Sequence, residues 1–261
     1  MQKLIFSFFL LSTIFVYSQK KQAIKITYVN TNFVDLTASS TDDLYLLTDN
    51  TISIYVKGKY SFKKSKIIPE EAIFAMPISN NADFIYISDN EKKIVLSKEN
   101  TIDRLFYITE PLLVQKWDIV DEFIEVNGIN LQKATTTFRG RNYTAWCDLN
   151  TPISQGPWKF NNLPGLAYEI FDDALDFHFE WRLIKISEPQ LYDISTYDFS
   201  KERIISQQDF VKNLNYFYKT NEDISLTRNL ENLDFEIVGS TTHKKINYRI
   251  RQKEKKYEWE E

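Results

Sequence analysis

GPWKFNNLPGLAYEIFDD, the stretch from Gly156 to Asp173, concentrates glycine, proline and aromatic residues that are sparse elsewhere in this chain of 261 residues. Gly156 and Pro157 predict a turn that opens the stretch. If the following residues are extended, Trp158 and Phe160 share one face and Lys159 points to the other. The stretch therefore predicts a sharp turn that presents two aromatic side chains together.

A second turn is expected inside the same stretch. Proline suits the first central position of a type II turn, and glycine supplies the positive φ that the second position requires. Pro164 and Gly165 therefore predict a type II turn. The chain would then return as a strand from Leu166 to Phe171.

A β-hairpin is expected just before this stretch. Two segments with strand character, from Gln132 to Phe138 and from Asn142 to Leu149, flank Arg139, Gly140 and Arg141. Glycine can adopt the positive φ that a tight hairpin turn requires. Both arginines would then lie at the tip of the hairpin.

The rest of the chain shows mainly the period-2 alternation of antiparallel strands, as at Ile24, Ile26 and Tyr28. Turn residues separate these runs at intervals typical of a meander of hairpins. One helix is expected near Gln207 to Lys219, because Ser206 to Asp209 has the form of a capping box. The predicted fold is mainly β: an antiparallel meander that forms a curved sheet or a partly open barrel.

The N-terminus has the features of a signal peptide. A single charge at Lys3 precedes an apolar run from Leu4 to Val16, and a small residue, Ser18, follows. We expect cleavage near Ser18, a single β-rich domain over residues 19–261, and a periplasmic or secreted location. The apolar run is short for a membrane span, so no transmembrane segment is expected after cleavage.

The composition of the chain limits which partners, cofactors and covalent links are expected. The formal net charge of −4 argues against nucleic acid as a partner, and no glycine pattern typical of a nucleotide cofactor is present. No cofactor is expected. Cys147 is the only cysteine, so the fold cannot contain an internal disulfide. Cys147 is expected to be a buried structural residue, and a nucleophilic pair with His178 or His243 is the alternative.

The series FRGR, AW, GPWKF and LPGL, within Phe138 to Leu166, resembles the GLPGLI family of exported bacterial proteins. The similarity extends over roughly Tyr86 to Leu183. It implies export, but the family has no established biochemical activity. The hexapeptide that corresponds to the family motif is Asn162, Leu163, Pro164, Gly165, Leu166 and Ala167.

Two interpretations of these turns remain open. In the first, they are a folding device, in which an aromatic plug closes one end of the sheet. In the second, aromatic and arginine side chains line the mouth of a ligand site on a rigid scaffold. The candidate ligand-binding residues are Arg139, Arg141, Trp146, Trp158 and Phe160.

A second candidate site follows the motif. Asp176, His178 and Glu180 alternate with aromatic residues, so they share one face of a predicted strand. This trio could hold a divalent metal, or it could be an ordinary solvated face with charge pairing.

We therefore expect a non-enzymatic binding or accessory protein of the cell envelope, with an apolar small molecule or an envelope protein as its partner. The alternative is a hydrolase or metal-dependent enzyme that uses the acidic and histidine strand face.

Overall fold

The computed structural model describes residues 20–33, 37–58, 60–63, 84–100, 104–174, 178–216 and 253–260. These residues form one 14-stranded sheet. The strands are β1 (Lys20–Phe33), β2 (Thr37–Leu47), β3 (Ile52–Val56), β4 (Tyr60–Lys63), β5 (Ile85–Asp89), β6 (Ile94–Asn100), β7 (Leu105–Pro111), β8 (Asp118–Val126), β9 (Ile129–Phe138), β10 (Arg141–Asp148), β11 (Leu166–Asp172), β12 (His178–Ile186), β13 (Gln190–Asp193) and β14 (Ile204–Ser206). The signal peptide predicted at the N-terminus lies outside the described residues.

The order of strands across the sheet is β14-β7-β6-β5-β3-β2-β1-β12-β11-β10-β9-β8, with β13 paired to β1 and β4 paired to β2. All described pairings are antiparallel except that of β14 with β7. The prediction of a mainly β antiparallel fold is confirmed. The sheet is open, because β14 and β8 lie at the two ends of the strand order and do not pair with each other in the described part of the chain.

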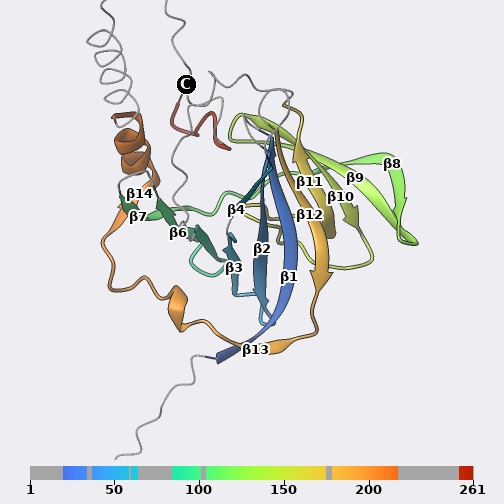
Figure 1. Cartoon of the computed structure of the whole chain (residues 1–261), viewed down its shortest axis with the longest axis horizontal. Helices are drawn as coiled ribbons and strands as arrows, with labels where there is room; N and C mark the ends of the chain where they lie inside the picture. Colours follow the sequence, from blue (N-terminus) through green and yellow to red (C-terminus); the bar gives the residue numbers. More distant parts are fainter. Residues whose placement is uncertain are drawn as a thin grey trace, which may run out of the picture.

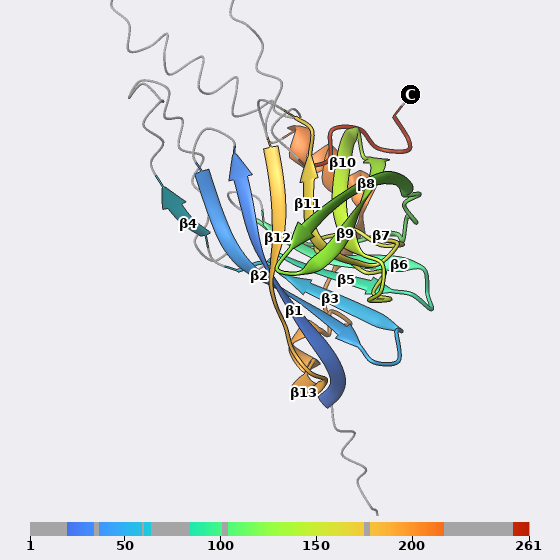
Figure 2. The same cartoon turned by 90° about the vertical axis from the view of Figure 1, so that its right-hand side faces the viewer.

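The sheet is strongly curved. Figure 1 shows β8 to β11 on one side of the molecule and β6, β7 and β14 on the other. In Figure 2, the strands β3, β5, β6 and β7 cross the direction of β1, β2 and β12. The main core lies inside this curve, since Tyr86 of β5 belongs to the same buried cluster as Trp181 of β12.

Alternation along the strands explains how this core forms. In β1, Ile26 and Tyr28 are fully buried on the inner face, and Leu44 and Leu46 of the paired strand β2 join them there. Successive side chains point to opposite faces, so the outer face of β3 and β5 buries a second, smaller cluster. That cluster consists of Ile54, Ile85, Ile87 and Phe199.

The single α-helix of the described residues begins at Gln207 and continues to Tyr216, where the description stops, and a short 3-10 helix lies at Ser195–Tyr197. Ser206 Oγ accepts a hydrogen bond from the Asp209 backbone N–H at 3.1 Å, which satisfies one of the free N–H groups of the first turn. Phe210 packs edge-to-face on Phe106 of β7, with 5.3 Å between ring centroids. The predicted helix and its cap are confirmed, and its predicted end at Lys219 lies outside the described residues. In the segments that the structure describes, no helix combines the length and apolar character that crossing a bilayer requires.

The predicted hairpin is also confirmed. Strands β9 and β10 pair Phe138 with Arg141, so Arg139 and Gly140 form a two-residue turn. Both turn residues have positive φ, 51° for Arg139 and 78° for Gly140. This is the backbone conformation of the tight hairpin turns that match strand twist.

Two local predictions are wrong. Gly165 does not have the positive φ of a type II turn; Asn162 does, at 55°. Position 165 requires glycine for a different reason: the Asp148 backbone passes so close that a Cβ at position 165 would lie 2.2 Å from the Asp148 carbonyl oxygen. In addition, Trp158 has a φ of 56° within a turn, so the segment is not extended and Lys159 is buried like its aromatic neighbours.

Candidate functional site

The structure separates the five predicted ligand-binding residues. Four of them, Arg139, Arg141, Trp158 and Phe160, are buried within the curve of the sheet. Trp146 lies between the fully buried neighbours Ala145 and Cys147 on β10, so its half-buried ring points to the opposite face.

The aromatic residues of the motif pack against one another. The Trp158 ring is stacked on Trp181 with 6.0 Å between centroids, and it meets Phe160 edge-to-face at 5.3 Å. Phe160 also contacts Tyr143, with centroids 4.8 Å apart. Trp158 and Phe160 are 3% and 2% exposed, so their surface is already used within the core. This geometry is that of an aromatic plug inside the sheet.

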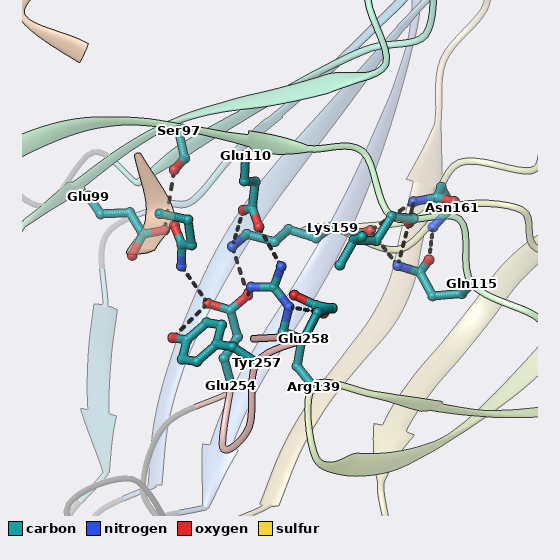
Figure 3. Close-up of polar contacts among 12 residues, drawn as sticks. Ser97, Glu99, Glu110, Gln115, Arg139, Lys159, Asn161, Glu254, Tyr257 and Glu258 are labelled. Atoms are coloured by element: carbon teal, nitrogen blue, oxygen red, sulfur yellow. Dashed lines mark hydrogen bonds and ion pairs between the residues drawn. The ribbon is translucent and has the colours of Figure 1, made fainter. Parts of the chain in front are cut away.

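Arg139 is the centre of a buried ion network, which Figure 3 shows. Its Nη2 lies 2.7 Å from Glu110 Oε2, its Nη1 lies 2.8 Å from Glu254 Oε1, and its Nε lies 2.8 Å from Glu258 Oε1. Burial alone would lower the pKa of the guanidinium, but the three carboxylates outweigh it and raise that pKa. Arg139 is therefore charged, and each of its three side-chain nitrogens has a carboxylate partner.

Lys159 completes this network. Its Nζ lies 2.6 Å from Glu110 Oε1 and 2.9 Å from Glu254 Oε1, so two cations alternate with two carboxylates in a closed cycle. We call Arg139, Glu110, Lys159 and Glu254 the ion ring. Burial lowers the pKa of Lys159, but Glu110 and Glu254 more than compensate, and the net shift is upward. The four formal charges of the ring balance.

The ion ring joins four distant segments of the chain. Glu110 comes from β7, Arg139 from the β9–β10 turn, Lys159 from the aromatic motif and Glu254 from the C-terminal segment, residues 253–260. That segment is also fixed by backbone hydrogen bonds, since the N–H groups of residues 255 and 256 donate to the Arg139 carbonyl at 2.8 and 3.2 Å. The ring is thus a structural tie rather than an open site.

Arg141 is occupied in a separate pair. It forms a buried ion pair with Asp172 of β11, and its guanidinium lies 4.7 Å from the centroid of the Phe179 ring. Asp172 Oδ1 also accepts a hydrogen bond from the Phe179 backbone N–H at 3.0 Å. Arg141 therefore holds β10, β11 and β12 together at one end.

A different group of polar side chains lies on the inner face of β1, β2 and their neighbours. We call it the interior polar patch, and it consists of Asn30, Ser40, Asp42, Lys57 and Lys253. Asp42 is satisfied within the protein, because its carboxylate accepts hydrogen bonds from the Tyr55 hydroxyl and, at 2.9 Å, from the Gly58 N–H. Trp181 Nε1 donates to the same Tyr55 hydroxyl at 3.1 Å.

Two members of the patch, Asn30 and Ser40, each have a side-chain oxygen without a hydrogen-bond partner among the described residues. Asn30 and Ser40 face each other across β1 and β2 and are 0% and 3% exposed. Within the described part of the chain, neither Asn30 Oδ1 nor Ser40 Oγ makes a hydrogen bond. Only the Nδ2 of Asn30 has a partner, a long contact of 3.5 Å to the Glu180 carbonyl. Such orphaned buried groups are rare in folded proteins.

The two lysines of the patch sit among aromatic rings. Lys253 Nζ lies 4.5 Å from the centroid of Trp181 and 5.8 Å from that of Phe179, and no ion pair joins it to a carboxylate of the described residues. Burial lowers its pKa well below the ordinary value, and the nearby Lys57 lowers it further. Burial also lowers the pKa of Lys57 to about 8.

The predicted metal trio is only partly described. Asp176 lies outside the described residues, and His178 is the first residue of β12. Glu180 Oε1 lies 2.6 Å from Arg182 Nη2, which also lies 2.8 Å from Glu169 Oε1. Among the described residues, no cluster of three metal-ligating side chains occurs. The trio stays a prediction, and its described carboxylate is in an ion pair.

Cys147 is fully buried and carries a free thiol. Burial raises its pKa to about 12, so the thiol is protonated near neutral pH. A protonated, inaccessible thiol does not act as a nucleophile. His243, one proposed partner for it, lies outside the described residues.

The ion ring and the interior polar patch were not predicted from the sequence. Of their members, only Arg139 was singled out for function. The one local signal was Lys159, a charge placed between two aromatic residues in the motif.

Comparison with known proteins does not assign a family. No family model and no curated protein matches the chain. Solved structures that resemble it include PNGF-II in two crystal forms, at 13% and 14% identity with TM-scores of 0.43 and 0.41 over 71% of this chain. Another is an uncharacterized conserved protein from Thermus thermophilus, at 7% identity and a TM-score of 0.38, which covers 72% of this chain and 93% of that one. This chain spans 31% of the length of PNGF-II. All three TM-scores lie below 0.5, so these likenesses carry no functional conclusion.

Proposed function

We propose that this chain is an exported, non-enzymatic binding or accessory protein of the bacterial cell envelope, which holds a small molecule at the interior polar patch. The observation that carries the proposal is the pair of buried, unpartnered oxygens, Asn30 Oδ1 and Ser40 Oγ. Export is supported by the apolar N-terminal run and by the resemblance to the GLPGLI family.

The cost of burying these atoms favours a ligand. A buried polar group without a hydrogen bond costs about 1–3 kcal/mol. Asn30 and Ser40 together therefore weaken the empty fold by about 2–6 kcal/mol, which is a sizeable fraction of typical protein stability. The ion ring offers a contrast, because its charges are paired within the protein and gain nothing from a ligand.

Hydrogen bonds and strand pairing connect the elements that surround the patch. The hydrogen bonds from Trp181 to Tyr55 and from Tyr55 to Asp42 tie β12, β3 and β2 to one another. The pairing of Asn30 with both Ser40 and Trp181 places β1 between these strands. A ligand would thus meet groups that are already held in position, which reduces the entropy lost on binding.

The alternative function, a hydrolase or metal-dependent enzyme that uses the acidic and histidine face of β12, has less support. Glu180 on that face is in an ion pair with Arg182, whose side chain is 64% exposed. A carboxylate in such a pair is a weaker candidate for a metal ligand or a general base.

Mass spectrometry of the full-length protein tests the proposal. The chain would be expressed with its own leader, purified from a bacterial periplasm, and weighed under native and denaturing conditions. We expect the native mass to exceed the denatured mass by that of a small molecule. Ser40→Ala should lose this excess, whereas Thr41→Ala, an exposed position on the other face of β2, should keep it.

A native mass equal to the denatured mass in every preparation would overturn the proposal. Elemental analysis of the same samples tests the enzyme alternative. A stoichiometric metal that His178→Ala abolishes would favour that alternative over a binding protein.

A further inference from the structure

We infer that the outer edge of β8 is a docking site for an extended, basic peptide segment of a partner protein, which adds a strand to the sheet. This inference does not depend on the proposed small-molecule site, because it concerns a different part of the molecule. It combines three observations: β8 ends the strand order, none of its residues is buried, and all of its charged residues are acidic.

Strand β8 is an edge strand. It is the last strand in the order of the sheet, and among the described residues it pairs only with β9. Figure 1 shows β8 at the rim of the molecule. Alternate residues of an antiparallel edge strand direct their N–H and C=O groups away from the neighbouring strand. Within the described chain, no backbone hydrogen bond joins β8 to a segment other than β9. Such an edge is a template for one more strand.

The exposed apolar side chains of β8 also favour an added strand. No residue of β8 is buried, and Ile119 and Phe123 are 54% and 51% exposed. Ile119 is opposite Ala134 of β9 and Phe123 is opposite Gln132, so both side chains project from the same face of the sheet. A strand beside β8 would cover these two side chains, and the apolar surface removed from water would favour docking.

A bulge divides β8 and limits where the new strand can pair. The register with β9 shifts between Ile119 and Phe123, and Gln132 Nε2 donates a hydrogen bond of 3.1 Å to the Val120 carbonyl in this interval. Regular pairing with β9 continues from Phe123 to Val126. Bulges interrupt pairing along a strand edge. We therefore place the incoming ladder along residues 123–126.

The charges of β8 define the chemistry of the partner. The strand contains Asp118, Asp121, Glu122 and Glu125 and no basic residue. Glu122 pairs with Lys133 of β9 at 2.9 Å, whereas Asp121 and Glu125 form no ion pair with the described residues. A strand that carries lysine or arginine beside these carboxylates would gain cross-strand charge pairs, and an acidic strand would be repelled.

The same charges exclude a second copy of β8 as the partner. Pairing of two β8 edges would bring the carboxylates of both copies together, and like charges opposite each other destabilise paired strands. Charged side chains on an edge are a common protection against self-association. In β8 the charges have a single sign, so they oppose pairing with the same strand but favour pairing with a basic one.

Fluorescence anisotropy with labelled synthetic peptides tests this inference on the full mature protein. The probes match β8 in length. One alternates lysine and valine, a second alternates arginine and isoleucine, a third has glutamate in place of the lysines of the first, and a fourth has proline in place of its valines. We expect the two basic alternating peptides to bind with one-to-one stoichiometry. The other two should bind at least ten-fold more weakly, because glutamate is repelled and proline has no N–H for the ladder.

Variants and hydrogen exchange assign the binding to β8. Asp121→Lys with Glu125→Lys should weaken binding of the lysine–valine peptide at least ten-fold and should allow the glutamate peptide to bind. The matched control is Glu188→Lys with Glu202→Lys, which makes the same change in net charge at two exposed positions outside β8 and should keep the preference for the lysine–valine peptide. In the native protein, this peptide should slow amide exchange in β8 and leave β13 unchanged.

The inference is wrong if neither basic peptide binds, if the proline or glutamate peptide binds as tightly, or if the double change in β8 leaves binding unaltered. It is equally wrong if a bound peptide does not protect the β8 amides, a measurement that needs no variant. Circular dichroism establishes that the variants are folded. The proposed function is judged separately, because the excess native mass and its loss in Ser40→Ala do not involve β8.

Discussion

Arg139 Nη2 and Glu110 Oε2 lie 2.7 Å apart, although Glu110 belongs to β7 and Arg139 directly follows β9, and these two strands lie near opposite ends of the sheet. In the strand order, β7 is second from one end and β9 is second from the other. The edge strands β14 and β8 do not pair in the described chain, so side chains rather than a backbone ladder connect the two ends. The ion ring thus stabilises the curvature that encloses the core.

Replacing Arg139 with methionine should strongly destabilise the protein. The change leaves Glu110 and Glu254 buried with one cation in place of two, and breaking a buried ion pair costs about 3–5 kcal/mol. Urea unfolding of Arg139→Met measures the loss. Arg182→Met is the matched control, because its exposed ion pairs contribute at most about 1 kcal/mol.

A loss for Arg139→Met that is no larger than the loss for Arg182→Met would show that the ring does not hold the sheet. Removing Glu110 as well, in Arg139→Met with Glu110→Gln, should cost less than the sum of the two single changes, because residues of one network do not act independently.

Gly165 and Gly128 should respond differently to alanine. At Gly165, a Cβ would lie 2.2 Å from the Asp148 carbonyl oxygen, which is backbone and cannot move aside. At Gly128, the Cβ would meet nothing within 4 Å, and only its φ of 79° is unfavourable. We expect Gly128→Ala to cost about 1 kcal/mol and Gly165→Ala clearly more. Thermal unfolding compares the two, and equal losses would contradict the close approach at Gly165.

Features that depend on neighbours in the sequence were predictable. The Arg139-Gly140 turn follows from a glycine between two alternating strands, and the helix start follows from Ser206 and Asp209. In each case the decisive hydrogen bonds join residues only a few positions apart. The antiparallel β class follows from the same short-range alternation.

The ion ring could not be predicted, because its contacts are long-range. Arg139 and Glu254 are separated by 115 residues, and nothing near either residue indicates the other. Lys159 was expected on the face opposite Trp158, since the alternation rule applies to extended chain. The positive φ of Trp158 makes the segment a turn, and the rule fails there. The polar patch was missed for a similar reason, since Asn30 and Ser40 face each other only once β1 and β2 pair.

Glu99 should make the protein less stable as the pH rises. Its pKa is raised from 4.5 to about 7 by burial, so the unfolded chain releases this proton at a lower pH than the folded chain does. Stability is therefore lost between about pH 4.5 and pH 7. Glu99→Gln removes this titration, and at pH 8 it should gain on the order of 3 kcal/mol over the native protein, relative to their difference at pH 4.5.

Urea unfolding at several pH values measures this difference, with Glu122→Gln as the control, because the Glu122 side chain is 55% exposed. A difference between Glu99→Gln and the native protein that does not change with pH would show that Glu99 is ionised normally in the fold.

The Cys147 thiol should be unreactive until the chain unfolds. The residue is fully buried on β10, and burial raises its pKa to about 12, so both access and ionisation oppose attack on a reagent. Dithionitrobenzoate at pH 8 can label the native protein only when the sheet opens. Given the free energy of unfolding of a typical protein, this labelling should be at least about a thousand-fold slower than labelling in urea. In urea, one thiol per chain should react at once, because Cys147 is the only cysteine. Rapid labelling of the folded protein would instead place the thiol in an accessible, ionised environment and revive the nucleophilic alternative.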